Sequence, residues 1–256
     1  MKFYCNLLKV IGLLSFIFAE KVSADSLSDL QQALLKLNGS EPVSGLLNVS
    51  FAETRGEGKD IKLKTGDIKS TLSESDKGLD ISYSKAVLSQ IAQENRLKLN
   101  DEEADTPVLN GAEILSASSL IPILSSAQTI LDYIKQGEFK GESFVTYMDK
   151  QVRILDFALP LESFIDDKKT RGYVNKFQGS YQVLIDDDGT PLETRRSYSG
   201  KGSAYIFFSM TAESQITSQF QIQGTRLVRI NKTVESNSSS TFNDRTYTGR
   251  WQLAIH

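Results

Sequence analysis

The side chains that most often carry covalent or acid–base chemistry are scarce in this chain of 256 residues. It contains one cysteine, Cys5, and one histidine, His256, which is also its last residue. Cys5 lies in a segment that we expect to be removed. The sequence therefore argues against catalysis of the Ser-His-Asp or Cys-His kind. It also argues against disulfide bonds and thiolate metal sites in the mature protein.

One short pattern has the form of a catalytic motif. Ser82-Tyr83-Ser84-Lys85 matches the S-x-x-K pattern of serine acyl-enzymes, in which a lysine one helical turn away helps to activate the serine. Lys64-Thr65-Gly66 matches the companion K-T-G motif, but in those enzymes that motif follows the serine and here it precedes it. Ser82 also falls in a predicted strand. A hydrolase that uses Ser82 and Lys85, or carboxylates alone, is the least favoured hypothesis.

An acidic turn is the strongest candidate for an ion site. Asp186-Asp187-Asp188-Gly189 places three carboxylates side by side, which repel one another unless something neutralises them. The following residues, Thr190-Pro191-Leu192, do not continue the spacing of an EF-hand calcium loop. A solvated hairpin tip is the favoured interpretation. We expect no metal site and no cofactor.

A long uncharged segment stands out in the middle of the chain. Ile114–Leu131 has no charged residue over 18 positions, but its serines and Pro122 argue against a membrane span. The favoured interpretation is a helix pair buried against a sheet. Two alternatives are a lid over a cavity for an apolar ligand and a helical dimer surface. The predicted ligand-binding residues are Leu120, Ile121, Leu124, Ile130, Leu131 and Ile134.

The N-terminal segment Met1–Ala24 has the pattern of a secretory signal peptide, with Lys2 before an apolar stretch and Val22-Ser23-Ala24 as the cleavage site. Cleavage after Ala24 predicts a periplasmic or secreted protein. The full chain has 29 basic and 32 acidic residues, and the segment holds three lysines and one glutamate, which leaves 26 and 31. A net charge of −5 argues against a nucleic-acid partner. Residues 171–256 nevertheless carry 10 basic and 7 acidic groups.

The apolar periodicity predicts helices and strands that alternate in blocks. Leucines at helical spacing after Ser26 predict a short amphipathic helix, and residues 85–137 lack strand patterns and predict a helical insertion. A loop is expected at Ser236–Asp244, which is rich in serine and asparagine. The expected strands are Val43–Phe51, Asp67–Glu74, Leu79–Tyr83, Phe139–Tyr147, Val152–Ala158, Tyr173–Ile185, Thr190–Ser199, Ala204–Met210, Ser214–Gln223, Thr225–Glu235 and Thr246–Ile255.

These elements predict an α+β fold. We expect a mainly antiparallel, curved sheet with an N-terminal helix and the helical insertion packed on or over the sheet, in a single domain of residues 25–256. This arrangement resembles that of the curved-sheet lipoprotein carriers of the bacterial periplasm, of the LolA and LolB type. The resemblance lies in the architecture and carries over no site residue.

The favoured function is that of an exported, non-enzymatic protein that binds an apolar or lipid-like ligand in a hydrophobic cavity between sheet and insertion. The alternative is an envelope-assembly or protein-interaction factor that uses a strand edge or the positive C-terminal half. We expect no stable transmembrane helix once the signal peptide has been removed.

Overall fold

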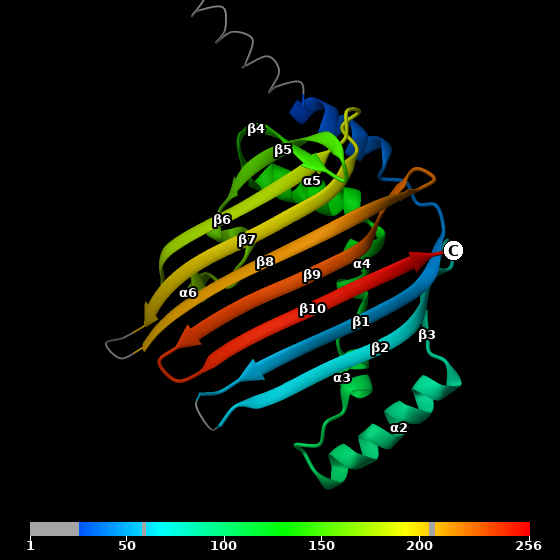
Figure 1. Ribbon diagram of the computed structural model, residues 1–256, viewed down its shortest axis with the longest axis vertical. Coiled ribbons are helices and arrows are strands. Elements are labelled where there is room, and N and C mark those ends of the chain that lie inside the picture. The colour runs from blue at the N-terminus through cyan, green and yellow to red at the C-terminus, as the bar shows by residue number, and fades with distance from the viewer. Residues whose placement is uncertain (1–25, 58–59, 205–207) are drawn as a thin grey trace, which may run out of the picture.

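Ten antiparallel strands form one open sheet (Figure 1). The computed structural model describes residues 26–57, 60–204 and 208–256, so the predicted signal peptide lies outside the described residues. The spatial order is β3-β2-β1-β10-β9-β8-β7-β6-β5-β4. The strands are β1 Val43–Arg55, β2 Lys62–Ser75, β3 Gly78–Ser82, β4 Glu138–Tyr147, β5 Lys150–Leu159, β6 Val174–Ile185, β7 Pro191–Ala204, β8 Phe208–Gln223, β9 Arg226–Ser240 and β10 Asp244–Ile255. The predicted α+β class and antiparallel pairing are confirmed.

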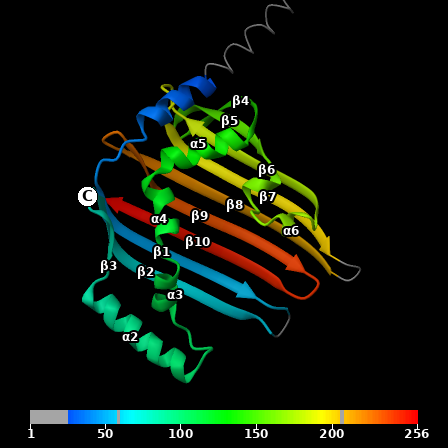
Figure 2. The ribbon, with the colours of Figure 1, turned by 180° about the vertical axis from the view of Figure 1, so that it is seen from behind.

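The two edges of the sheet are joined by the helical segment. β3 forms one edge and β4 the other, and they are consecutive strands in the sequence. Nine inter-strand steps of about 4.8 Å separate them, so the connection has to cross more than 40 Å of sheet. It does so as α2 Lys85–Asn100, α3 Pro107–Glu113, α4 Ala117–Leu124 and α5 Ser126–Gln136. Figure 2 shows α3, α4 and α5 crossing one face, called here the inner face.

The first part of this crossing is fastened closely to β2. The backbone N–H of Leu109 in α3 donates to the Glu94 carboxylate of α2 at 2.7 Å, and the Asn110 amide donates to the Thr65 carbonyl at 2.8 Å. Gly111 lets α3 approach the strand, since a Cβ there would lie 2.9 Å from the Cβ of Ile68. α2 itself lies beside the β3 edge (Figure 2).

The buried apolar residues form two large clusters. The first lies beneath α5 and the N-terminal helix (residues 26–36), with strand residues from β5, β6 and β9. The second lies beneath α4, with buried strand residues from β1, β2, β9 and β10. The central strands β7 and β8 contribute no buried apolar residue to either cluster among the described residues. The middle of the inner face is therefore built differently from its two sides.

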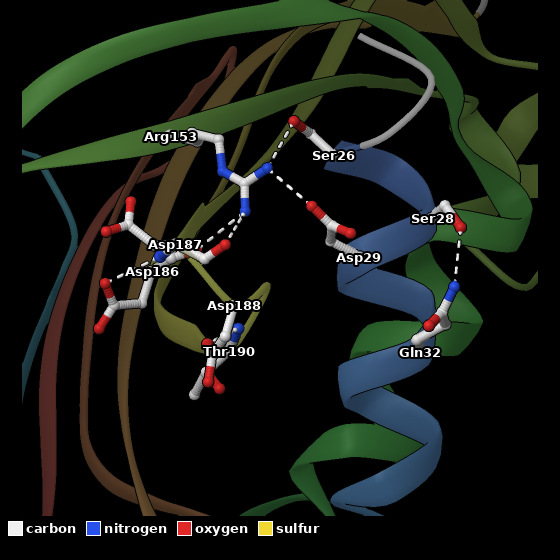
Figure 3. A network of polar contacts seen from close by, with 9 residues as sticks. All are labelled: Ser26, Ser28, Asp29, Gln32, Arg153, Asp186, Asp187, Asp188 and Thr190. Carbon is white, nitrogen blue, oxygen red and sulfur yellow. Dashed lines mark hydrogen bonds and ion pairs between the residues drawn. The ribbon is translucent and has the colours of Figure 1, made fainter. Parts of the chain in front are cut away.

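Arg153 of β5 fastens the N-terminal helix to the sheet (Figure 3). Its guanidinium donates to the Ser26 hydroxyl at 2.8 Å and to the Asp29 carboxylate at 2.9 Å. It also donates to the carbonyls of Asp186 and Asp187 in the β6–β7 turn, at 3.1 and 2.7 Å. The side chain is only 14% exposed. The acidic turn is thus a hairpin tip held through its backbone.

Several predicted boundaries are wrong. The helical insertion expected at residues 85–137 is divided into four helices: Pro107 starts α3, and breaks at Ser116 and Ser125 separate α3, α4 and α5. Thr211–Glu213, the expected gap between two strands, is continuous strand in β8, paired throughout with β7 and β9.

The prediction of a loop at Ser236–Asp244 is also wrong for most of that segment. β9 runs to Ser240 and β10 begins at Asp244. Serine and asparagine have low strand propensity, but β8 and β10 pair with this segment on both sides, and pairing on two sides outweighs propensity.

The helices were also compared with the requirements of a bilayer span. Among the described residues, no single helix is long and apolar enough to cross a membrane. α3 and α4 meet the length and composition requirements only as a pair, with a bend of 72° between them.

Replacing Arg153 with methionine removes the guanidinium and keeps much of the apolar stem. The Asp29 carboxylate and the two turn carbonyls then lose their donor, so we expect R153M to lower the free energy of unfolding by about 2–4 kcal/mol. Urea unfolding followed by circular dichroism measures this. The exposed Arg250 provides the control, and R250M should cost less than about 0.5 kcal/mol. Equal effects of R153M and R250M would contradict the role of Arg153 in holding the N-terminal helix and the β6–β7 turn to the sheet.

Candidate functional site

A cavity of about 200 Å³ lies between the helices and the middle of the inner face. Its roof comes from α4 and α5, and its floor from β6, β7, β8 and β9. It therefore occupies the position where the two apolar clusters do not merge. Its lining comprises Ser118, Ser119, Pro122, Thr129, Ile130, Tyr133, Tyr181, Thr194, Arg196, Ile216, Ser218, Phe220, Arg229 and Lys232.

A β-bulge brings two of the cavity's cations to the same face. Asn231 pairs with Gln219 of β8, but the next pair is Arg229 with Phe220, so Ile230 is an extra residue in β9. In a regular strand, residues 229 and 232 would point to opposite faces. The bulge reverses the alternation, and both Arg229 and Lys232 line the cavity.

Burial and mutual repulsion disfavour the charged forms of these two side chains. Burial, together with the charges of Arg229 and Arg196, lowers the pKa of Lys232 to about 8. Burial also lowers the pKa of Arg229 to about 10. At neutral pH both remain protonated. The Nε of Arg229 is buried and has no hydrogen-bond partner among the described residues. The Lys232 ammonium lies 4.1 Å from the ring centre of Trp251.

Arg196 of β7 supplies the third cation. It donates a hydrogen bond to the Tyr133 hydroxyl, and its guanidinium lies 4.8 Å from the centre of the Tyr133 ring and 5.3 Å from that of Phe164. Burial lowers its pKa as well. The aromatic faces stabilise the charge in part. Tyr181, whose own pKa is raised by burial, completes this wall.

None of Arg196, Arg229 and Lys232 forms an ion pair with a carboxylate in the described part of the chain. Other partly buried arginines are paired: Arg153 with Asp29, and Arg226 with Glu74. Buried charges are ordinarily paired, because desolvation is costly. Three cations that share one cavity without a counter-charge are therefore an exception, and such exceptions are typical of functional sites.

The structure separates the six predicted ligand-binding residues. Ile130 lines the cavity. Leu120 and Leu124 are buried in the cluster beneath α4, whereas Leu131 and Ile134 are buried in the cluster beneath α5. Ile121 is 56% exposed. The uncharged segment is thus mainly a buried helix pair, with Ile130 at the cavity.

The other candidate sites lie apart from the cavity. Ser82 ends β3 and Lys85 begins α2, and both are exposed. Within the described ranges, no group of three or more His, Cys, Asp or Glu side chains could hold a metal ion. A larger groove of about 670 Å³ crosses β6–β10, but the charged side chains of Lys201, Glu213 and Asp244 along it are exposed and solvated.

The sequence analysis missed the three cations. One signal was present: in the predicted strand Thr225–Glu235, Lys232 shares its alternation with Val228, Ile230 and Val234, which places a charge on an apolar face. Arg229 gave no such signal, because the bulge at Ile230 is not visible in the sequence pattern. The excess of basic residues after residue 171 is consistent with the finding.

Comparison with known proteins adds no family. No protein-family profile, curated protein sequence or solved structure matches the chain. The geometry of the cavity therefore has to support the functional conclusion by itself.

Replacing Lys232 with methionine removes one of three mutually repelling charges. We expect K232M to raise the free energy of unfolding at pH 7 by about 1–2 kcal/mol, whereas loss of a buried side chain usually lowers it. Urea unfolding of both proteins, with the exposed Lys69→Met as control, measures the difference.

The difference in the free energy of unfolding between K232M and the wild type should depend on pH. The folded-state pKa of about 8 lies below the ordinary value of 10.5, so between these values the unfolded chain holds a proton that the folded protein has lost. Raising the pH through this window therefore stabilises the wild type relative to K232M, and the advantage of the variant shrinks. A constant difference from pH 7 to 10.5 would contradict the assigned environment of Lys232.

Proposed function

We propose that this protein binds a small amphiphilic ligand in the cavity between α4–α5 and the inner face of the sheet. The observation that carries the proposal is the position of the cavity. It lies beneath a cover of two helices and over β7 and β8, which contribute no buried apolar residue to either cluster among the described residues. A fold that only needed a stable core would fill this place with apolar side chains.

The lining of the cavity supports a ligand with two kinds of surface. Pro122, Ile130 and Phe220 offer apolar contacts, while serine and threonine hydroxyls and the cations offer polar ones. Binding sites for small molecules commonly combine an apolar wall with a few placed polar groups. A volume of about 200 Å³ is small for such a site, so it encloses a head group and the first part of a chain rather than a complete lipid.

Export belongs to the same proposal. The N-terminal pattern of a signal peptide supports a periplasmic or secreted location in the bacterial envelope, where lipid-like molecules need carriers. Ser82 and Lys85 are both exposed, at the end of β3 and the start of α2, and we favour a binding role over hydrolysis.

One observation favours a second candidate, an envelope-assembly or interaction factor. The edge strand β4 presents Phe144, 61% exposed, and the turn after it presents Met148, 74% exposed. Exposed apolar side chains on a strand edge are suited to pairing with another chain. A stable complex recovered by crosslinking, together with an empty cavity, would favour this candidate.

Filling the cavity should abolish ligand binding. Thr129 lines it from α5, whereas its neighbour Gln128 is exposed. We expect wild type and Q128F to bind octan-1-ol saturably in calorimetric titrations, and T129F to bind at least tenfold more weakly because its ring occupies the cavity. Circular dichroism checks that each variant is folded.

Octan-1-ol is chosen because it is uncharged and tests the cavity alone. Equal binding by T129F and the wild type would overturn the proposal, and so would failure of the wild type to bind any eight-carbon amphiphile, charged or uncharged. Native mass spectrometry of the purified protein gives a second test, because a ligand carried from the cell should be retained by Q128F and lost from T129F.

A further inference from the structure

We infer that Arg196, Arg229 and Lys232 form a binding site for the phosphate group of the amphiphilic ligand. This inference rests on the proposed function and names the chemical class of the ligand. Its starting point is that three cations share one cavity and none is paired with a carboxylate of the described chain. An anion bound among them would supply the missing counter-charge.

The strand register places the three cations around one point. Arg196 lies on β7 opposite Ile216 of β8, while Lys232 and Arg229 lie on β9 opposite Ser218 and Phe220 of the same β8. β7 and β9 are two inter-strand steps apart, about 9–10 Å. Long basic side chains from both strands can turn towards a group that sits over β8; the Lys232 ammonium, which lies 4.1 Å from the Trp251 ring of β10, would swing from that ring to reach it. The small Ser218 leaves room for it on the floor of the cavity.

Free donors are available in this place. The buried Nε of Arg229 has no hydrogen-bond partner in the described structure. A guanidinium carries five N–H donors and an ammonium carries three. One donor of Arg196 forms the hydrogen bond to the Tyr133 hydroxyl. Ser118 and Ser119 in the first turn of α4 also line the cavity, but their hydroxyls are already hydrogen-bonded within the cap of that helix, so the free donors are those of the cations. Several donors thus surround a space without an acceptor of matching charge.

Charge and donor number favour phosphate over carboxylate. A phosphate monoester carries a charge of about −1.5 to −2 at pH 7 and three acceptor oxygens. A carboxylate carries one charge on two oxygens. Three cations match the former more closely, and guanidinium groups bind phosphate in a bidentate manner. The apolar wall of Pro122, Ile130 and Phe220 then receives the start of the attached chain.

A series of probes with one tail and different heads tests this directly. Purified full-length mature protein is titrated by calorimetry at pH 7 with octyl phosphate, octanoate, octan-1-ol and inorganic phosphate. We expect octyl phosphate to bind at least 100-fold more tightly than octan-1-ol, and octanoate to lie between them. Equal affinity for octyl phosphate and octan-1-ol would overturn the inference while leaving the apolar cavity in place.

Matched variants assign the effect to the named residues. R229Q and K232Q should each weaken octyl phosphate at least tenfold more than they weaken octan-1-ol, because only the charged head loses an ionic partner. The exposed Arg250 and Lys69 provide the controls R250Q and K69Q, which should change neither probe. Unchanged octyl phosphate binding in both R229Q and K232Q would overturn the inference.

Inorganic phosphate separates the two sources of the anion. Binding as tight as that of octyl phosphate, lost in R229Q, would support the anion site and assign it to free phosphate, against the proposed function. Binding of octyl phosphate far above both inorganic phosphate and octan-1-ol supports a phosphorylated amphiphile. Absence of binding by all four probes would overturn the proposed function and the inference together.

Discussion

The structure depends on one topological constraint: the chain leaves the sheet at one edge and re-enters at the other. β3 and β4 follow each other in sequence but lie at opposite edges of ten strands, so residues 85–136 have to cross a face. The crossing explains why the uncharged segment is needed. Its apolar helices bury the inner faces of the outer strands, and breaks at Ser116 and Ser125 let the segment follow the sheet. The cover of the inner face is therefore part of the connection.

The crossing buries the two sides of the sheet more completely than its centre. Apolar clusters form beneath α4 and beneath α5, and the space between them is lined in part by β7 and β8, which contribute Thr194, Arg196 and Ser218 beside Ile216 and Phe220. Three unpaired cations in this space lower the stability of the empty protein, because each is partly desolvated and repels the others. A bound anion would offset both the desolvation of the cations and their mutual repulsion. The unpaired cations of the inner face and the proposed binding site are thus in the same place.

The sequence predicted what alternation and turn residues determine. The leading helix, the antiparallel strands, the acidic hairpin tip and the helical insertion were all expected and are present. The cations were not predicted. The bulge at Ile230 changes which face Arg229 occupies, and a bulge depends on pairing with β8. The Ser236–Asp244 segment was expected to be a loop, but its strand structure comes from neighbours on both sides. Both errors concern the pairing of a strand with its neighbours, which cannot be predicted from the residue pattern of that strand alone.

The charge state of Lys232 tests the account most directly. Side-chain NMR of the protein, with the exposed Lys69 as an internal reference, follows its titration. The account predicts a pKa of about 8 for Lys232 in the empty protein, and a rise towards or above the ordinary 10.5 when octyl phosphate is bound. A pKa near 10.5 in the empty protein, unchanged by octyl phosphate, would contradict the uncompensated cationic cavity on which the inferred phosphate site is built.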